Sequence, residues 1–347
     1  MRRFGILTLL PLAVIVVSGC GGSGNGGGSS TPLTQAEVYG VPQEGYVDGG
    51  PALAQFANPA KVEVGPDGAV YVADYDNYAI RMIAPNGIVS TLVKMNNFRQ
   101  PFGLTFSPDG YLYVSTDAND QGVKNATSGT VWRVNVKTKQ TIVVAANIGR
   151  PRGLYAISAT EIAMGDILQH TVSILNTVTK TVTVLAGSKG VTGHVNGNGS
   201  AARFNRPYGL CQTPDGSLIV ADANNNCLRR VTLSGDVTDY AGTTVAGADN
   251  GPLLSSTFQS PQDVRASEGS IYVADTGNHI IRRITNEGVT TQAGDGTAGF
   301  IVAPGLHAEF YGLEGFAIRP GSRTLWIADG NGGDGSDHNH VRKITVP

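Results

Sequence analysis

Short apolar runs alternate with polar turn residues along most of the chain. Gly, Pro, Asn and Asp recur between these runs about every eight to twelve residues, a spacing that is typical of β-hairpins and larger antiparallel sheets. The apolar period of about 3.6 residues that marks amphipathic helices is confined to single turns such as residues 52–56. The pattern therefore predicts an all-β protein.

Six segments share one sequence pattern. Each begins with an apolar strand that usually ends in Asp, continues with a polar turn and ends with a second strand that is usually basic. A second mark recurs in the same phase, an aromatic or aliphatic residue followed three positions later by Pro or, in the last copy, Leu. Two marks in register identify an internal repeat. The first strands end at Asp74, Thr116, Asp166, Asp222, Asp275 and Asp329, and the second mark begins at Phe56, Phe98, Ile148, Phe204, Phe258 and Phe310.

Each repeat reads as four strands, which we call strands a to d. In the fourth copy they are predicted at residues 208–213, 217–222, 227–232 and 236–241. One antiparallel sheet of this kind cannot bury both faces, so the six sheets are expected to pack radially into a six-bladed β-propeller. The predicted blades span approximately residues 59–93, 101–145, 151–186, 207–242, 261–293 and 313–346 plus 36–40.

The two ends of the repeat array indicate how the ring closes. The last copy stops after its third strand, at residues 340–346, whereas residues 36–40 match the fourth strand that ends at Gly242. The N-terminal strand is therefore expected to complete the last blade, which would leave no open sheet edge between the first and last repeats.

The fifth copy carries the phrase Tyr272-Val273-Ala274-Asp275, the turn Gly277-Asn278-His279 and the basic strand at residues 281–284. These motifs resemble the NHL repeat, and the resemblance covers essentially residues 38–346. It implies a propeller whose d-to-a and b-to-c connections share one face, the usual ligand side. Copy two departs from the pattern at Thr116, and copy three lacks the basic strand at residues 172–175.

The N-terminal residues have the pattern of a targeting signal. Arg2 and Arg3 precede an apolar run at residues 4–17, which is too short for a transmembrane helix but suits a signal peptide. The run leads into Val17-Ser18-Gly19-Cys20, which resembles the lipobox of bacterial lipoproteins and implies cleavage before a lipidated Cys20. The alternative is an ordinary secretory signal.

On this interpretation residues 1–19 are the signal peptide, residues 20–33 are the lipidated Cys20 and a Gly/Ser-rich tether, and residues 34–347 are the propeller. The expected location is the bacterial cell envelope, with the protein lipid-anchored and extracytoplasmic. In a Gram-negative cell that location is the outer membrane or another periplasm-facing site.

The charge balance argues against one class of partner, and the positions of the cysteines predict whether they form a disulfide. Lys and Arg total 25 residues and Asp and Glu total 27, so no overall electrostatic field favours nucleic acid, and we expect the protein not to bind it. We also expect the protein to be a monomer. Cys211 and Cys227 fall on predicted strands a and c of one blade, two strand spacings of about 4.8 Å apart. They are therefore expected to remain free, buried thiols.

Positions around the inner start of strand a differ from blade to blade. Arg99, Arg150, Arg152 and Arg206 are expected to converge at the channel mouth, where arginines beside aromatic rings suit a carboxylate or phosphate on a planar or apolar body. The alternative is a set of solvated arginines. The candidate ligand-binding residues are Arg99, Phe102, Arg150, Arg152, Arg206, Tyr208, Gln262 and Glu314.

Two b-to-c connections are long, at residues 117–129 and 330–340. Oxygen and imidazole groups of the second suit Ca²⁺ or Zn²⁺, the only cofactors that the sequence suggests. Its spacing matches no standard metal motif, and the alternative is a glycine-rich solvent loop. The candidate ligands are Asp329, Asn331, Asp334, Asp337, His338 and His340. The aspartates that end strand b are instead expected to accept backbone N–H bonds at the turn.

Two functions remain open. The first is a binding or scaffolding module for a protein, peptide or glycan partner. The second is a metal-assisted lyase or lactonase, similar to gluconolactonases or amidating lyases, with its site at the channel mouth. The sequence contains no nucleophile elbow, phosphate-binding loop or zinc-protease helix, which favours the first.

Overall fold

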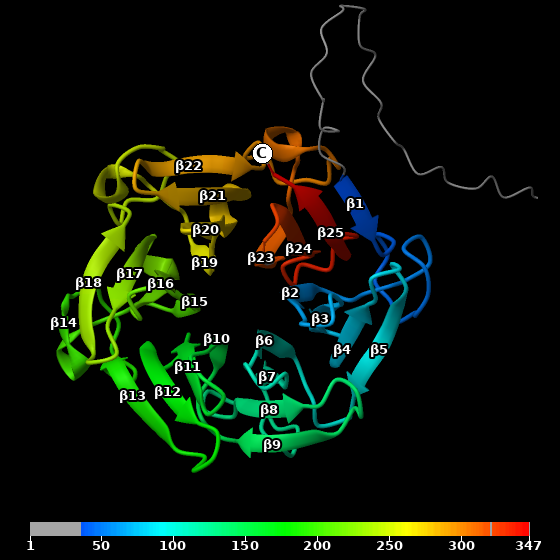
Figure 1. Cartoon of the computed structure of the whole chain (residues 1–347), viewed down its shortest axis with the longest axis horizontal. Helices are drawn as coiled ribbons and strands as arrows, with labels where there is room; N and C mark the ends of the chain where they lie inside the picture. The colour runs from blue at the N-terminus through cyan, green and yellow to red at the C-terminus, as the bar shows by residue number, and fades with distance from the viewer. Residues whose placement is uncertain (1–35, 320, 347) are drawn as a thin grey trace, which may run out of the picture.

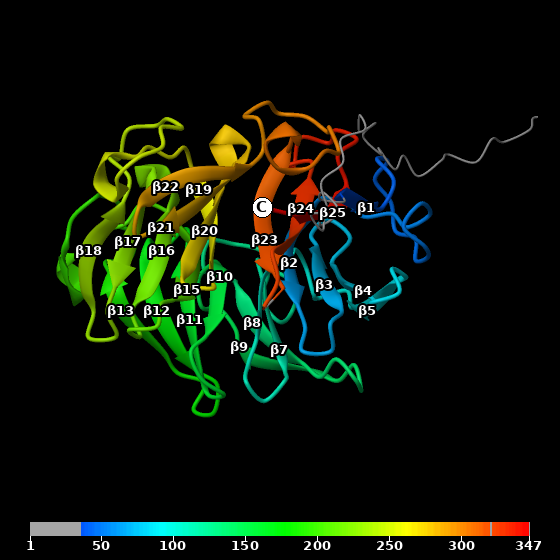
Figure 2. The same ribbon diagram turned by 45° about the horizontal axis from the view of Figure 1, so that its top comes forward.

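The computed structural model describes residues 36–319 and 321–346, whose strands form six antiparallel sheets arranged in a ring (Figure 1). Each sheet has four strands, and a short fifth strand extends the fourth sheet. The innermost strand of every blade faces the axis, and the strands run between the two faces of the ring (Figure 2). The predicted six-bladed β-propeller is confirmed.

The blades are formed as follows, from the axis outward. Blade 1 contains β2 (Pro59–Val64), β3 (Val70–Asp74), β4 (Ala79–Ile83) and β5 (Val89–Lys94). Blade 2 contains β6 (Pro101–Phe106), β7 (Leu112–Thr116), β8 (Thr130–Val134) and β9 (Thr141–Ala145). Blade 3 contains β10 (Pro151–Ala156), β11 (Glu161–Asp166), β12 (Thr171–Asn176) and β13 (Val182–Gly187).

Blade 4 contains β15 (Pro207–Gln212), β16 (Leu218–Asp222), β17 (Cys227–Val231) and β18 (Asp236–Ala241), with β14 (Gly197–Asn198) at its edge. Blade 5 contains β19 (Pro261–Ser267), β20 (Ser270–Asp275), β21 (Ile280–Thr285) and β22 (Gly288–Ala293). Blade 6 contains β23 (Gly312–Ile318), β24 (Thr324–Gly330), β25 (His340–Thr345) and β1 (Ala36–Tyr39).

The helical elements are five short 3₁₀ turns in the connections, η1 (Gly199–Ala201), η2 (Ala223–Asn225), η3 (Leu253–Ser255), η4 (Thr276–Asn278) and η5 (Gly305–His307). Among the described residues no helix is long and apolar enough to cross a bilayer.

The ring closes through the N-terminal strand, as the repeat pattern predicts. β1 pairs antiparallel with β25, with Ala36 opposite Ile344 and Tyr39 opposite Val341. The Tyr39 ring is buried and lies 5.1 Å from that of Trp326 on β24. Residues from opposite ends of the described chain therefore share one blade and one hydrophobic cluster.

A buried ion pair recurs inside four blades. The aspartate that ends strand b contacts an arginine seven residues later in blades 1, 4 and 5, and Arg342 in blade 6, at 2.9, 3.2, 2.9 and 2.5 Å. Both side chains of each pair are buried, and the aspartates also accept backbone N–H bonds, although the donors lie at the end of the d-to-a connection and not in the b-to-c turn where they were expected. The pairs are Asp74–Arg81, Asp222–Arg229, Asp275–Arg282 and Asp329–Arg342.

These arginines hold the long d-to-a connections in place. Arg81 lies 5.2 Å from the centre of the Phe56 ring and donates to the carbonyls of Val47 and Gln55. Arg229, Arg282 and Arg342 make equivalent contacts with the loops that precede their own blades. Blades 2 and 3 have short d-to-a connections and no arginine at this position, so the arginine and the long loop occur together.

Buried charged side chains of the innermost strands bridge blades 1 and 5. Lys61 on β2 contacts Asp263 on β19 at 2.6 Å, and both are almost completely buried. The pair can form because blade 6, which lies between them, presents Gly315. A Cβ there would lie 2.6 Å from Lys61 Cδ. Arg265 and Glu63 extend the network at 2.9 Å.

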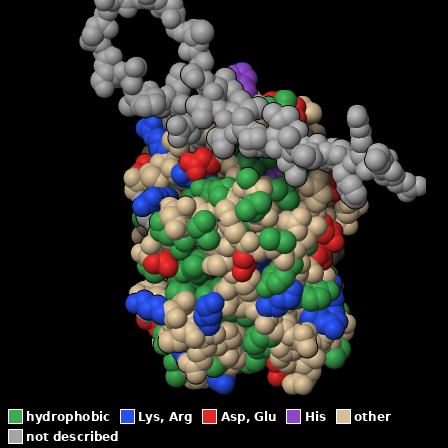
Figure 3. All heavy atoms as spheres, turned by 90° about the vertical axis from the view of Figure 1, so that its right-hand side faces the viewer, with side chains coloured by type: hydrophobic (Ala, Val, Ile, Leu, Met, Phe, Trp, Pro, Cys, Tyr) green, Lys and Arg blue, Asp and Glu red, His purple; other side chains and the backbone are tan. Residues whose placement is uncertain are grey.

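The outer surface carries no extended patch of one charge on the side that holds β1 and β5 (Figure 3). Acidic, basic and hydrophobic side chains are interspersed on this face. The two cysteines of the described chain, Cys211 and Cys227, are free and buried, as predicted.

Candidate ligand site at the channel mouth

An apolar floor lies across the end of the channel that faces the b-to-c turns. Phe102 of β6 and Tyr208 of β15 meet edge to face, with their ring centres 6.1 Å apart, and Tyr75 meets Phe102 in the same way at 6.2 Å. Ala60, Ile167 and Ala223 complete the buried cluster, which draws on blades 1 to 4. Phe102 and Tyr208 therefore support the site from below, and their rings are buried.

Arg152, the second residue of β10, lies on this floor. Its guanidinium is 4.3 Å from the centre of the Phe102 ring. It donates to the Tyr75 hydroxyl at 2.9 Å and to Asp117 Oδ2 at 3.0 Å. Burial alone would lower the pKa of Arg152, but Asp117 and the two tyrosines raise it well above its ordinary value. Arg152 is thus a fixed cation at the centre of the mouth.

Asp117 is the carboxylate around which the cluster is built. It begins the long b-to-c connection of blade 2, is buried, and accepts the Tyr75 hydroxyl at 2.8 Å. Arg150 Nε and Lys124 Nζ lie 3.7 and 3.8 Å from the same carboxylate oxygen. Burial raises the pKa of Asp117, but Arg152 and Arg150 outweigh it, so the pKa lies below its ordinary value.

Sequence reasoning did not select Asp117 as a site residue. Blade 2 has Thr116 where other blades have the strand-b aspartate, and Asp117 follows one position later, out of phase with the repeat. The signal that could have found it is the pairing of this shifted acid with the arginines beside Pro151.

Arg206 stands apart from any acid. Its guanidinium donates to the Tyr208 hydroxyl at 3.1 Å, and in the described part of the chain no carboxylate lies within 4.0 Å of it. Arg150 is also partly exposed and only 3.7 Å from Asp117, which it shares with Arg152. The two arginines therefore present cationic groups that the protein itself neutralises incompletely.

The opposite side of the mouth, from blades 5 and 6, is neutral to acidic. Glu314 and Gln262 are half-buried there. Burial raises the pKa of Glu314 although Arg152 lowers it. Gln262 Oε1 is buried without a hydrogen-bond partner among the described residues.

Arg99 lies outside this cluster, contrary to the expected convergence of four arginines. It is exposed, 5.8 Å from the centre of the Tyr78 ring, and its Nε bonds only the carbonyl of Asn96. The reason is its position: Arg150 and Arg206 directly precede the proline that starts strand a, whereas Arg99 lies one residue further back in the loop.

The connection proposed to bind a metal does not bring its candidate ligands together. Asp329 is held by Arg342 and by the backbone N–H groups of Tyr311 and Gly312. Across residues 36–319 and 321–346, no group of three or more His, Cys, Asp or Glu has the geometry to hold a metal ion.

The remaining candidates of that connection have separate contacts. Asp334 accepts the Tyr311 hydroxyl, Asn331 Oδ1 accepts the N–H of Gly333, and Asp337 is exposed. The two imidazoles stack on aromatic rings, His338 on Tyr311 and His340 on Phe300, with ring centres 4.1 and 4.0 Å apart.

His340 gives the protein a specific acid sensitivity. Burial, with Arg342 and His338 nearby, lowers its pKa from 6.5 to about 3. Below pH 6.5 the unfolded chain therefore takes up a proton that the folded chain refuses, so stability falls as the pH falls.

Between pH 7 and pH 5 this one group is expected to remove about 2 kcal/mol of unfolding free energy. Replacing His340 by Phe, which retains a ring to stack on Phe300, should remove that component. Urea unfolding at the two pH values measures the difference between wild type and variant, in which other titrating groups cancel. If the unfolding free energies of wild type and variant changed equally with pH, His340 would not be buried as a neutral ring.

Comparison with known families locates the chain among β-propellers. A family model described as the teneurin NHL domain matches residues 45–150, and the NHL repeat model matches residues 204–230 and 258–284. The human NHL repeat-containing protein 2 is 34% identical over 123 residues, which cover 32% of this chain and 17% of that protein. The chain thus spans less than a fifth of that relative's length.

Solved structures share the fold at low identity. An auxiliary nutrient binding protein from Bacteroides thetaiotaomicron superposes with a TM-score of 0.68 at 15% identity, covering 90% of this chain and 77% of that one. Virginiamycin B lyase from Staphylococcus aureus superposes with a TM-score of 0.58 at 15% identity, covering 90% of this chain and all of that one.

Proposed function

Since the chain is a six-bladed β-propeller of the NHL-repeat family, we propose that it is a binding module whose channel mouth receives an anionic group of a protein, peptide or glycan partner. The observation that carries this proposal is the pair of partly exposed guanidinium groups, Arg150 and Arg206, above a buried aromatic floor. One carboxylate, Asp117, is shared by Arg150 and Arg152, and Arg206 has no acid in contact among the described residues.

The geometry supports a carboxylate or phosphate as the recognised group. A guanidinium offers paired N–H donors that match two oxygens of such an anion. Arg152, Asp117 and Tyr75 hold one another by hydrogen bonds, so the floor is ordered before a ligand arrives and less ordering opposes binding. A planar body attached to the anion can stack on the guanidinium faces.

The proposal predicts that Arg150→Ala combined with Arg206→Ala weakens the binding of anionic probes by at least about tenfold. The probes are inorganic phosphate, benzoate and a short glutamate-containing peptide, titrated calorimetrically at low ionic strength. Arg99→Ala is the matched control, because it removes an exposed arginine outside the cluster and should leave affinity unchanged. Equal affinities of the double variant and the wild type would remove the channel mouth as the site.

A metal-assisted lyase or lactonase is less well supported. Such a site needs several His or acidic ligands directed into the channel, and the described residues contain no such group. Glu314 is the one acid among the residues that follow the strand-a mark. The name of the Bacteroides neighbour refers to nutrient binding, which agrees with a binding role at the level of the fold.

We propose further that the propeller is tethered to the bacterial envelope by lipid on Cys20, after removal of residues 1–19. These residues lie outside the described part of the chain. Expression in a bacterial host with an alkyne-tagged fatty acid should label the wild type and place it in the membrane fraction. Cys20→Ser should lose both properties, and Cys211→Ser should keep them. Labelling that survives Cys20→Ser would refute the anchor.

A further inference from the structure

Blade 3 retains half of the ion pair that occurs in blades 1, 4, 5 and 6. Asp166 ends its strand b, but the residue seven positions later is Ser173, where blades 1, 4 and 5 have arginine. The ring-bearing residue of the d-to-a connection is also replaced, by Ile148. Asp166 therefore has no arginine partner on the third strand of its own blade, unlike the aspartates of blades 1, 4, 5 and 6.

Blade 2 shows the contrasting case, in which both members have changed. Thr116 replaces the aspartate and Trp132 replaces the arginine, and the indole N–H donates to the threonine hydroxyl at 2.9 Å. Neither member of this pair carries a charge. Blade 3 is thus the blade that keeps the carboxylate while lacking the cation.

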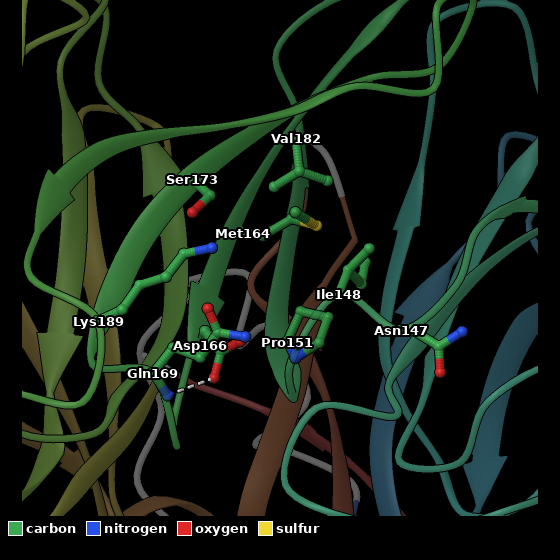
Figure 4. A pocket seen from close by; sticks show the side chains of 9 residues that line it. All are labelled: Asn147, Ile148, Pro151, Met164, Asp166, Gln169, Ser173, Val182 and Lys189. Carbon is green, nitrogen blue, oxygen red and sulfur yellow. Dashed lines mark hydrogen bonds between the residues drawn. The ribbon is translucent and has the colours of Figure 1, made fainter.

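A cavity of about 170 Å³ occupies the place of the missing arginine. One water needs roughly 10–15 Å³ on this measure, so the cavity exceeds a single water many times over. A second hollow of about 450 Å³ lies beside Thr127, and Asn147, Gln169 and Lys189 line both. Figure 4 shows the lining side chains, which are Asn147, Ile148, Pro151, Met164, Asp166, Gln169, Ser173, Val182 and Lys189.

The polar groups of the cavity fit a planar cation. Asp166 is 4% exposed and accepts the backbone N–H groups of Arg150, Leu168 and Gln169 at 2.8 to 2.9 Å. Burial raises its pKa, and these N–H groups lower it in part. Within residues 36–319 and 321–346, no lysine, arginine or histidine nitrogen lies within 4.0 Å of this carboxylate, although four equivalent aspartates each have such a partner.

Asn147 and Gln169 also line the cavity, and the amide of Gln169 supplies a further acceptor. Neither side chain makes a hydrogen bond among the described residues. In blades 1, 4, 5 and 6 the arginine bonds loop carbonyls in addition to the aspartate, and here the Gln169 amide oxygen can take that role, whereas the Asn147 amide points away from Asp166 (Figure 4). Lys189 is exposed and also lines the cavity, and in Figure 4 its side chain extends towards Met164 and Ser173, so its ammonium has to turn towards solvent when a guanidinium enters.

We propose that this cavity binds a guanidinium group, supplied either by an arginine side chain of a peptide partner or by a small alkylguanidinium. The planar, weakly hydrated guanidinium distributes its N–H donors over the Asp166 carboxylate and the Gln169 amide oxygen, which a compact ammonium cannot do. The site is separate from the arginine cluster of the channel mouth and attracts the opposite charge.

The experiment uses butylguanidinium as the probe and butylammonium as the comparison, at constant ionic strength. Nuclear magnetic resonance should show saturable shifts of the Leu168 and Gln169 amides, which bond Asp166, with butylammonium at least about tenfold weaker. Tighter binding of a blocked Gly-Arg-Gly peptide than of butylguanidinium identifies a peptide side chain as the source, and the reverse order identifies a small molecule. Equal binding of the two cations overturns the proposal.

Refilling the cavity provides the second test. Ser173→Arg should restore the ion pair, raise the melting temperature and abolish butylguanidinium binding. Thr183→Arg is the matched control, since it adds the same charge at an exposed position of the same blade and should leave binding unchanged. Asp166→Asn should weaken binding at least about tenfold. Arg206→Ala should not affect it, which separates this site from the channel mouth. Binding that survives Ser173→Arg contradicts the proposal.

Discussion

Asp263→Asn is expected to lower the free energy of unfolding by about 3–5 kcal/mol, because it leaves the Lys61 ammonium uncompensated in the interior. Lys61 and Asp263 are 2% and 1% exposed and 2.6 Å apart. Asp263 also accepts the N–H of Phe316 and lies 3.5 Å from Arg265. Burial lowers the pKa of Lys61, and Asp263 is the first group that raises it. Urea unfolding at neutral pH measures the loss.

An exposed aspartate supplies the control. Asp215 pairs with Arg230 on the surface, where both side chains are about half exposed, so Asp215→Asn should leave the unfolding midpoint almost unchanged. Lys61→Met combined with Asp263→Leu should recover much of the loss, because it removes both charges together. If the buried and exposed substitutions had the same effect, Lys61 and Asp263 would be hydrated and the buried ion pair described above would be wrong.

Breaking the contact between the two ends of the chain is expected to have an effect of similar size. Tyr39→Ala removes a buried ring that packs on Trp326, and large-to-small substitutions of this kind cost about 3–5 kcal/mol. The loss should appear as a lower unfolding midpoint for the whole domain, because blade 6 joins the first and last repeats. Tyr78→Ala, which changes a less buried tyrosine elsewhere in the ring, should have a much smaller effect.

A disulfide tests the same closure directly. Glu37 and Lys343 face each other across β1 and β25, and their side chains form a partly exposed pair at 2.6 Å. Opposed residues of antiparallel strands have Cα atoms about 4.5–5.5 Å apart, which is within disulfide reach. Glu37→Cys with Lys343→Cys should form a bond on oxidation and raise the melting temperature. Failure to form it would contradict closure by the N-terminal strand.

The fold could be predicted because its determinants repeat. Six in-phase strand phrases identify the blades, and the surplus strand at residues 36–40 identifies the closure. The candidate site was harder to predict than the fold, because the residues that could bind a ligand are those that differ from one repeat to the next. Arg150, Arg152 and Arg206 could be placed because each adjoins the proline mark of its own blade.

Other features depend on the three-dimensional arrangement. Lys61 meets Asp263 across an intervening blade only because Gly315 has no side chain, a relation that spacing along the chain does not encode. Asp117 lies out of phase, and the cavity beside Ser173 becomes visible only once the Asp–Arg pairs of the other blades are known. In each case the informative signal is one blade's departure from the pattern of the others.

The most direct test of the binding proposal observes the arginines themselves. The Nε–H groups of Arg150 and Arg206 have no hydrogen-bond partner among the described residues and are resolved by ¹⁵N labelling. Titration with benzoate or phosphate should shift both resonances along one saturable curve and leave that of Arg99 in place. Shifts that are equal for all three arginines and do not saturate would mean that the channel mouth has no ligand site.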